Sequence, residues 1–165
     1  MAPVRSDYVG VVTQNAAGIK IDWYLRRSID YRATVNEATH VITADVKISL
    51  HNLAPTAGEP PIVIDGQSGV VTAPGESKLY LSLYSPWGVL AATVNGEATP
   101  VASQHELARH VYSMFVTTPS GATTTVEFHL FGVLSSGTLP YSLQQYRQPA
   151  LVPDRDSTSV TIVGG

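Results

Sequence analysis

The sequence contains no cysteine. This absence excludes disulfide bonds, zinc sites built from thiolates and a cysteine nucleophile. It does not fix the compartment, because many envelope proteins of bacteria have no disulfides. No apolar run reaches the roughly 18 residues that a membrane-spanning helix needs, so we expect no membrane contact by this chain itself. The first residues, MAPVRSDYVG, also lack the positive-then-apolar order of a signal peptide.

Charge is scarce as well. Only 14% of the residues are charged, and 10 basic against 13 acidic side chains give a formal net charge of -3. The basic residues form no run, which argues against nucleic acid as a partner, because such proteins gather Lys and Arg on one surface. No pattern typical of a cofactor site is present either, so none is predicted.

What the sequence does contain is long period-two alternation. Residues 21–52 are predicted to form two long strands joined by a short turn. The apolar positions of one parity are Trp23, Leu25, Ile29 and Tyr31 in the first strand and Ile42, Ala44, Val46, Ile48 and Leu50 in the second. Alternation of this length is typical of half-buried antiparallel strands.

Charge predicts the register of this hairpin. With a four-residue turn at 37–40, Asp30 faces Lys47 and Arg32 faces Asp45. A shorter turn would place Arg26 opposite Lys47, which is repulsive. Cross-strand charge pairs contribute about 0.2–1 kcal/mol each, so the longer turn is favoured.

Other segments complete an all-β pattern. Further strands are predicted at 8–14, 78–84, 89–94, 97–101, 109–118, 122–131, 141–148 and 159–163. Asn95-Gly96 is a strong hairpin signal, and the proline-rich residues 53–69 are predicted to be a loop with a brief edge strand at 62–64. Ser103 and Glu106 have capping-box spacing, which predicts one helical turn at 103–108.

The predicted fold is therefore an all-β, two-sheet antiparallel sandwich, immunoglobulin-like, with about nine or ten strands and at most one short helical turn. Residues 1–165 are predicted to form a single β-sandwich domain.

Motifs that could carry catalysis or bind metal do not have the required spacing. His105 and His110 are five residues apart, which on a helix rotates them by about 140°, unlike the HExxH zinc signature. His40, His51 and His129 also show no ligand spacing. We therefore predict no metal site and no catalytic residue.

Two other segments have similarly plain interpretations. Residues 154–156, Asp-Arg-Asp, are interpreted as a solvated loop, and Gly66-Gln67-Ser68-Gly69 lacks the spacing of a nucleophile elbow. The chain is thus predicted not to be an enzyme. Because catalytic triads are spatial arrangements, a hydrolase or transferase stays as a second alternative.

Arg27 is the one charge on the apolar parity of the first long strand. One interpretation is an arginine near a sheet end, with its stem packed and its head reaching solvent or a carboxylate. The other is an interior ion pair or a contact with a ligand.

Three aromatic residues define a candidate surface. Tyr80 and Tyr84 occupy the polar parity of their strand, and Trp87 follows in a tight turn. Aromatic rings suit the apolar faces of sugars, so these side chains are a candidate surface for a ligand or partner. The alternative is that another part of the chain covers them.

Three patches resemble a known family: residues 14–31, 48–63 and 141–163. Together they are similar to the C-terminal region of bacterial envelope proteins in the domain-of-unknown-function family 4012. The positions that match its pattern are Asn15, Gly18, Lys20, Asp22, Trp23, Tyr24, Leu25, Asn52, Ala54, Pro55, Leu83, Tyr84, Pro86, Asn95, Gly96, Gln148 and Pro149.

The resemblance implies an extracytoplasmic location in the cell envelope, as the excised C-terminal module of a longer protein that a transmembrane helix anchors. It supplies no catalytic residues. We expect a non-catalytic structural or interaction module, and the alternative is a carbohydrate-binding module for envelope polysaccharide. The expected partners are the preceding region of the same polypeptide and envelope polysaccharide or another envelope protein.

Overall fold

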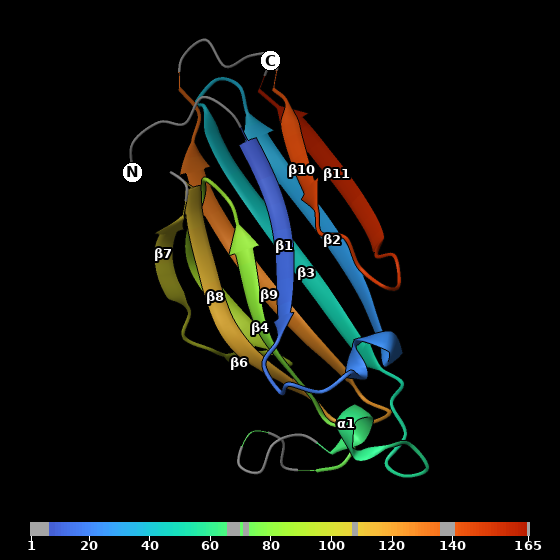
Figure 1. Cartoon of the computed structure of the whole chain (residues 1–165). Helices are drawn as coiled ribbons and strands as arrows, with labels where there is room; N and C mark the ends of the chain where they lie inside the picture. The colour runs from blue at the N-terminus through green and yellow to red at the C-terminus, as the bar shows by residue number, and fades with distance from the viewer. Residues whose placement is uncertain (1–6, 66–69, 71–72, 107–108, 136–140, 165) are drawn as a thin grey trace.

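The computed structural model describes residues 7–65, 70, 73–106, 109–135 and 141–164. Within these ranges two β-sheets form a sandwich-like, elongated body (Figure 1). The five-stranded sheet has the order β10 (Leu143–Arg147), β1 (Asp7–Asn15), β4 (Ser77–Tyr84), β8 (Arg109–Thr118) and β7 (Ala102–Glu106). The six-stranded sheet has the order β11 (Arg155–Val163), β2 (Leu25–Asn36), β3 (Val41–Asn52), β9 (Thr123–Val133), β5 (Gly88–Val94) and β6 (Glu97–Ala98).

The long hairpin has the predicted register. β2 ends at Asn36 and β3 begins at Val41, and the pairs Asp30–Lys47 and Arg32–Asp45 lie opposite one another. His40 closes the turn with a φ of 57°, a left-handed conformation that only a minority of non-glycine residues adopt. Asn95 and Gly96 likewise have positive φ values, 51° and 84°, as a two-residue hairpin turn requires.

The sheets are mixed, so the prediction of purely antiparallel sheets was wrong. β1 pairs in parallel with β10, and β2 pairs in parallel with β11. The cause is a pair of nested corners. The chain crosses from the five-stranded to the six-stranded sheet between β1 and β2, which we call the inner corner. It crosses in the same direction between β10 and β11, which we call the outer corner. Because β10 lies beside β1 and β11 lies beside β2, both pairs of neighbouring strands run in parallel.

Three local predictions also require correction. Residues 103–106 form part of strand β7 instead of a helical turn, because pairing with β8 satisfies their backbone groups, while residues 107–108 lie outside the described residues. The expected edge strand at 62–64 is instead helix α1 (Pro61–Ile64), where proline suits the first helical position. The start of the first long strand is a 3-10 turn, η1 (Ile21–Tyr24), which leaves Trp23 63% exposed.

The core lies between the two sheets. Alternate residues of β3, Ile42, Val46, Ile48 and Leu50, are buried as their parity predicts, and they join Leu79, Leu81 and Leu83 of β4 in one cluster. A second, smaller cluster of Ala17, Ile19, Ile21 and Ala54 closes the end of the molecule that carries α1. The outward positions of both sheets are therefore the surfaces available to a partner.

Candidate functional site

The outer side of the five-stranded sheet carries several aromatic side chains. Tyr80 and Tyr84 alternate with the buried leucines of β4, so they point away from the core. Tyr80 lies opposite Phe115 of β8, and Tyr84 lies opposite Gly10 of β1. We define the aromatic face as the outward residues Tyr8, Tyr80, Tyr84, Phe115 and Tyr146, which come from β1, β4, β8 and β10.

Small residues occupy the middle of this face. Gly10 is buried, and a Cβ atom there would lie 3.1 Å from the Cβ of Tyr146. Ser82 and Ser113, which are cross-strand partners, join their hydroxyls at 2.9 Å and are only 8% and 3% exposed. Short side chains therefore separate the aromatic residues in the middle of this face.

Polar contacts orient several of these rings. The guanidinium carbon of Arg109 lies 4.5 Å from the ring centre of Tyr146, and its Nη2 donates to that tyrosine's hydroxyl at 3.0 Å. Tyr84 donates to Glu106 at 2.6 Å, and Tyr80 packs against Phe115 with ring centres 5.0 Å apart. Phe115 is 61% exposed and Tyr146 is 40% exposed, so both offer ring surface to a ligand.

Of the three residues predicted as a candidate surface, Tyr80 and Tyr84 lie on this outer face, whereas Trp87 does not. Trp87 is fully buried, and its ring packs on Gly132 of β9, where an added Cβ would lie 2.1 Å from the ring atom Cε3. The sequence interpretation missed Tyr8, Phe115 and Tyr146. Their parity was visible in the sequence, but their proximity depends on the strand order of the sheet.

A second group of polar side chains lies inside the sandwich, between the nested corners. Arg27 is 7% exposed and forms a two-armed ion pair with Asp154, at 2.8 Å from Nε to Oδ1 and 2.6 Å from Nη2 to Oδ2. Its Nη1 donates to Thr13 at 3.0 Å and to Gln148 at 3.1 Å. The interior ion pair, one of the two interpretations of Arg27, is the one that the structure has.

Hydrogen bonds near Arg27 hold the outer corner, the segment between β10 and β11, against β1. The Gln148 side chain accepts from the backbone N–H of Thr13 at 2.8 Å and donates to its carbonyl at 2.9 Å. These contacts line a cavity of about 190 Å³. The interpretation of 154–156 as a solvated loop was therefore wrong, because Asp154 pairs inside and Asp156 belongs to β11, where it pairs with Arg147 at 3.1 Å.

The inner corner is held by Asn15. Its Oδ1 accepts from the backbone N–H groups of Ala17 at 2.9 Å and Gly18 at 3.1 Å. Its Nδ2 donates to the carbonyl of Ile19 at 2.6 Å and to Asp22 at 3.2 Å. Asn15 and Asp22 are among the residues that carry the family resemblance, and here they shape the turn between the sheets.

Asp7 is a carboxyl buried among aromatic residues. The hydroxyls of Tyr31, at 2.9 Å, and Tyr141 both donate to its Oδ2. Burial raises the pKa of Asp7 to about 6, against the lowering effect of these donors and of the Trp87 indole. The indole N–H and Oδ1 of Asp7 nevertheless form no hydrogen bond of normal geometry.

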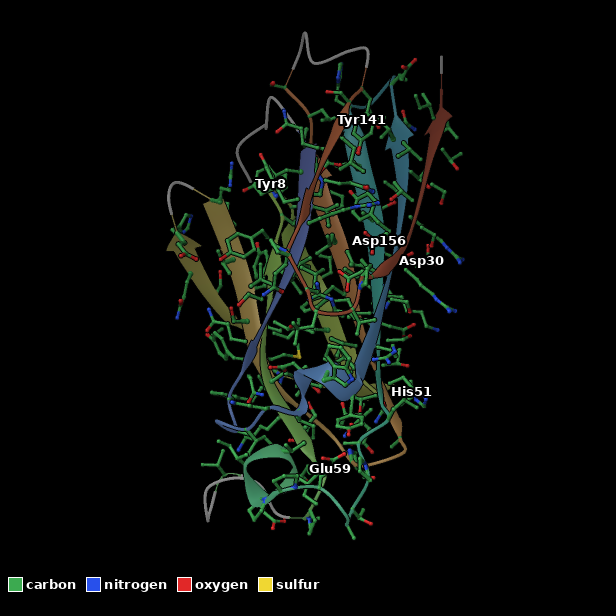
Figure 2. The ribbon with its side chains drawn as sticks, turned by 45° about the vertical axis from the view of Figure 1, so that its right-hand side comes forward. Tyr8, Asp30, His51, Glu59, Tyr141 and Asp156 are labelled. Atoms are coloured by element: carbon green, nitrogen blue, oxygen red, sulfur yellow. The ribbon has the colours of Figure 1, made fainter. Side chains whose placement is uncertain are left out.

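Tyr8 and Tyr141 lie toward one end of the molecule, and His51 and Glu59 lie toward the other (Figure 2).

The histidines do not assemble a metal centre among the described residues, which contain no group of three or more potential ligands. His105 and His110 are cross-strand partners with ring centres 4.0 Å apart. Burial, together with His105, lowers the pKa of His110. His129 contacts Asp45 at 2.6 Å, and His51 contacts Thr123 at 2.9 Å.

Residues 66–69, which were considered for a nucleophile elbow, lie outside the described residues. No described helix is both long and apolar enough to cross a membrane.

The comparisons with known proteins give distant likenesses only. No protein-family model matches the sequence, and the search of curated proteins finds no relative. A presumed nutrient binding protein from Legionella pneumophila is 6% identical with a TM-score of 0.48, over 76% of this chain and 43% of that one. A variant of the M1 zinc metallopeptidase from Deinococcus radiodurans is 16% identical with a TM-score of 0.38, over 70% of this chain and 22% of that one. The same enzyme variant with a bound Tyr-Ser-Ala substrate gives 19% and 0.39 over the same shares. This chain thus spans less than half the length of each protein, and likenesses this distant carry no argument about activity or ligand.

Proposed function

We propose that this chain is a non-catalytic binding module and that its aromatic face is the contact surface. The observation that carries the proposal is the gathering of Tyr8, Tyr80, Tyr84, Phe115 and Tyr146 on one outer face of the five-stranded sheet. The described outer positions of β2, β3 and β9 carry instead paired charges such as Asp30–Arg32 and Lys47–Glu127. The two faces therefore differ in chemistry, and the aromatic one is suited to a flat ligand.

A carbohydrate chain is the ligand class that fits this face. Exposed aromatic rings match the apolar faces of sugar rings, and sugar hydroxyls need side chains that both donate and accept hydrogen bonds. Three exposed glutamines supply these groups: Gln14 is the cross-strand partner of Tyr80, Gln104 of Val111, and Gln144 of Tyr8. A partner protein with a purely apolar surface would leave these amides without partners.

The proposed setting is the bacterial cell envelope. The similarity of residues 14–31, 48–63 and 141–163 to the C-terminal region of the domain-of-unknown-function family 4012 supports an extracytoplasmic module of a longer, membrane-anchored protein. In that setting, envelope polysaccharide is the proposed ligand. The preceding region of the polypeptide and other envelope proteins are the other proposed partners.

Titration of the whole chain with soluble cell-wall polysaccharides, followed by calorimetry, tests the proposal. We expect saturable binding that Phe115→Ala and Tyr80→Ala each weaken by about tenfold, the effect of losing one stacked aromatic contact. Leu90→Ala is the matched control, because Leu90 is 70% exposed but belongs to β5 of the other sheet. If no polysaccharide binds, or if Leu90→Ala weakens binding as much as Phe115→Ala, the aromatic face is not a sugar site.

A further inference from the structure

We infer a second, separate binding site, for a sugar that carries a phosphate or carboxylate group, on the outer side of the six-stranded sheet. The argument rests on Arg26, Ser28, Ser49, His51, Leu53 and Arg155, which line one cleft of about 580 Å³ together with Arg27, Val152 and Pro153. We call it the arginine cleft. It shares no residue with the aromatic face and does not depend on the function proposed for that face.

Strand register brings these side chains together. Arg155 of β11 lies opposite Ser28 of β2, and Ser28 lies opposite Ser49 of β3. One step along the same face, Arg26 lies opposite His51. Residues two apart in a strand share a face, so both arginines, both serines and the histidine are outward on three adjacent strands.

Two of the positive charges in the cleft, those of Arg26 and Arg155, have no carboxylate partner among the described residues, whereas Arg27 is paired with Asp154. No aspartate or glutamate lines it, and among the described residues neither Arg26 nor Arg155 forms an ion pair. Within the described part of the chain, the Arg26 side chain donates to two backbone carbonyls, those of Trp23 at 2.9 Å and Leu25 at 3.1 Å. Farther along this face, Arg32 is paired with Asp30 at 2.6 Å. Two unpaired arginines in one cleft form a charge arrangement that complements an oxyanion, which a guanidinium can bind with two parallel hydrogen bonds.

The size and the walls of the cleft indicate more than a free ion. Ligand sites of about 300–1,000 Å³ hold small molecules, and the 580 Å³ here exceeds what a single phosphate needs. Leu53, which is 46% exposed, and Val152 add apolar wall to the hydroxyls of Ser28 and Ser49. His51 engages Thr123 through Nδ1 at 2.9 Å, so Nε2 is its other polar atom. An acidic or phosphorylated sugar matches this mixture of charge, hydroxyl and apolar surface.

Nuclear magnetic resonance titration of the isotopically labelled full chain at constant ionic strength tests the site with four probes: glucose 1-phosphate, glucuronate, glucose and inorganic phosphate. We expect saturable shifts at the amides of Ser28, Ser49 and His51 with one of the two anionic sugars, and the stronger of the two identifies the anion. Neutral glucose should bind at least about tenfold more weakly, because it lacks the charge-assisted hydrogen bonds. Saturation by inorganic phosphate as tight as by glucose 1-phosphate would overturn the assignment to a sugar-sized ligand.

Variants separate the cleft from general charge effects. Arg155→Gln and Arg26→Gln should each weaken binding of the anionic sugar by about tenfold, while Arg32→Gln, which removes one exposed and paired arginine of the same face, should leave it unchanged. Arg155→Gln is the decisive variant, because Arg155 makes no ion pair among the described residues that folding could need. Equal losses in Arg32→Gln and Arg155→Gln, or no saturable shift with either anionic sugar, would refute the site. Phe115→Ala should not affect it.

Discussion

Arg27 of β2 and Asp154, which immediately precedes β11, meet inside the sandwich with Nη2 and Oδ2 2.6 Å apart. Their side chains are only 5% and 9% exposed. Because Arg27 also reaches Thr13 and Gln148, one guanidinium connects β1, β2 and both ends of the segment between β10 and β11. These contacts therefore link the two parallel strand pairs, β1 with β10 and β2 with β11.

Removing one partner of this ion pair should be costly. We expect Asp154→Ala to lower the free energy of unfolding by about 3–5 kcal/mol, because it leaves the buried charge of Arg27 without compensation. Asp30→Ala, which breaks the more exposed pair with Arg32, should cost about 1 kcal/mol or less. Urea denaturation measures both. The double variant Arg27→Met with Asp154→Leu should recover most of the loss, and equal costs in Asp154→Ala and Asp30→Ala would contradict the interior role of the pair.

Asp7 should make stability fall as the pH rises. Burial raises its pKa from the ordinary value of 3.8 to about 6. At a pH between these two values, the folded state therefore holds a proton that the unfolded state has lost. The stabilisation is complete below the unfolded pKa and is lost as the pH rises through about 6, a change of about 3 kcal/mol at 1.36 kcal/mol per pKa unit. Unfolding free energies measured from pH 4 to 7.5 should show this slope, and Asp7→Asn should remove it.

The hydrogen bonds to Asp7 give a second check. Tyr141 donates to the Asp7 carboxyl and lowers its pKa. In Tyr141→Phe the pKa of Asp7 should therefore rise further, and the loss of stability should move to higher pH. An unchanged slope in Asp7→Asn would assign the pH dependence to other groups.

The sequence predicted the elements that local patterns determine. The β2–β3 hairpin follows from alternating apolar positions and from charges that only one register pairs, such as Asp30 with Lys47. The parallel pairs could not be predicted in this way, because the partners of β10 and β11 are distant in sequence and no turn between them sets the direction. Ser103 and Glu106 have the spacing of a helix cap, but cross-strand pairing with β8 outweighs that weak local preference.

The residues of the candidate site could likewise be predicted only where a local pattern determines them. Alternation with buried leucines placed Tyr80 and Tyr84 on an outer face. The sequence leaves open whether Trp87, in the tight turn that follows, joins them or is covered by another part of the chain. It is buried, because Gly132 of a distant strand leaves space for its ring. Phe115 and Tyr146 join the face only through the strand order β10-β1-β4-β8, which the sequence alone does not reveal.

The contact between Trp87 and Gly132 predicts a strong substitution effect. A methyl group at position 132 would lie 2.1 Å from the indole, and neither the central strand β9 nor the buried ring can easily shift. We expect Gly132→Ala to lower the free energy of unfolding by about 1–3 kcal/mol through overpacking. In a Trp87→Leu background the same change should cost clearly less, since neighbours in contact are energetically coupled. Additive costs in thermal or urea unfolding would contradict this contact.

Asn52 at the end of β3 should tolerate neither truncation nor a negative charge. It is fully buried, and its Nδ2 donates to the carbonyls of Gly75 at 2.8 Å and Thr118 at 2.9 Å. Its Oδ1 accepts from the backbone N–H of Ala54 at 3.0 Å. Asn52→Ala leaves these buried groups without partners and should lower the free energy of unfolding by about 2–4 kcal/mol.

Asn52→Asp is the sharper test of the same contacts. An ionised carboxylate has no hydrogen to donate to the two carbonyls, so the aspartate is favoured in its protonated form, and the stability of this variant should increase as the pH falls. Asn95→Asp is the matched control, because Asn95 is exposed and its Oδ1 only accepts, from the N–H of Thr125 at 2.8 Å. Urea denaturation at pH 5 and pH 7.5 should separate the two variants. If Asn52→Asp is as stable as Asn95→Asp at both pH values, the amide of Asn52 does not hold this end of the sandwich together.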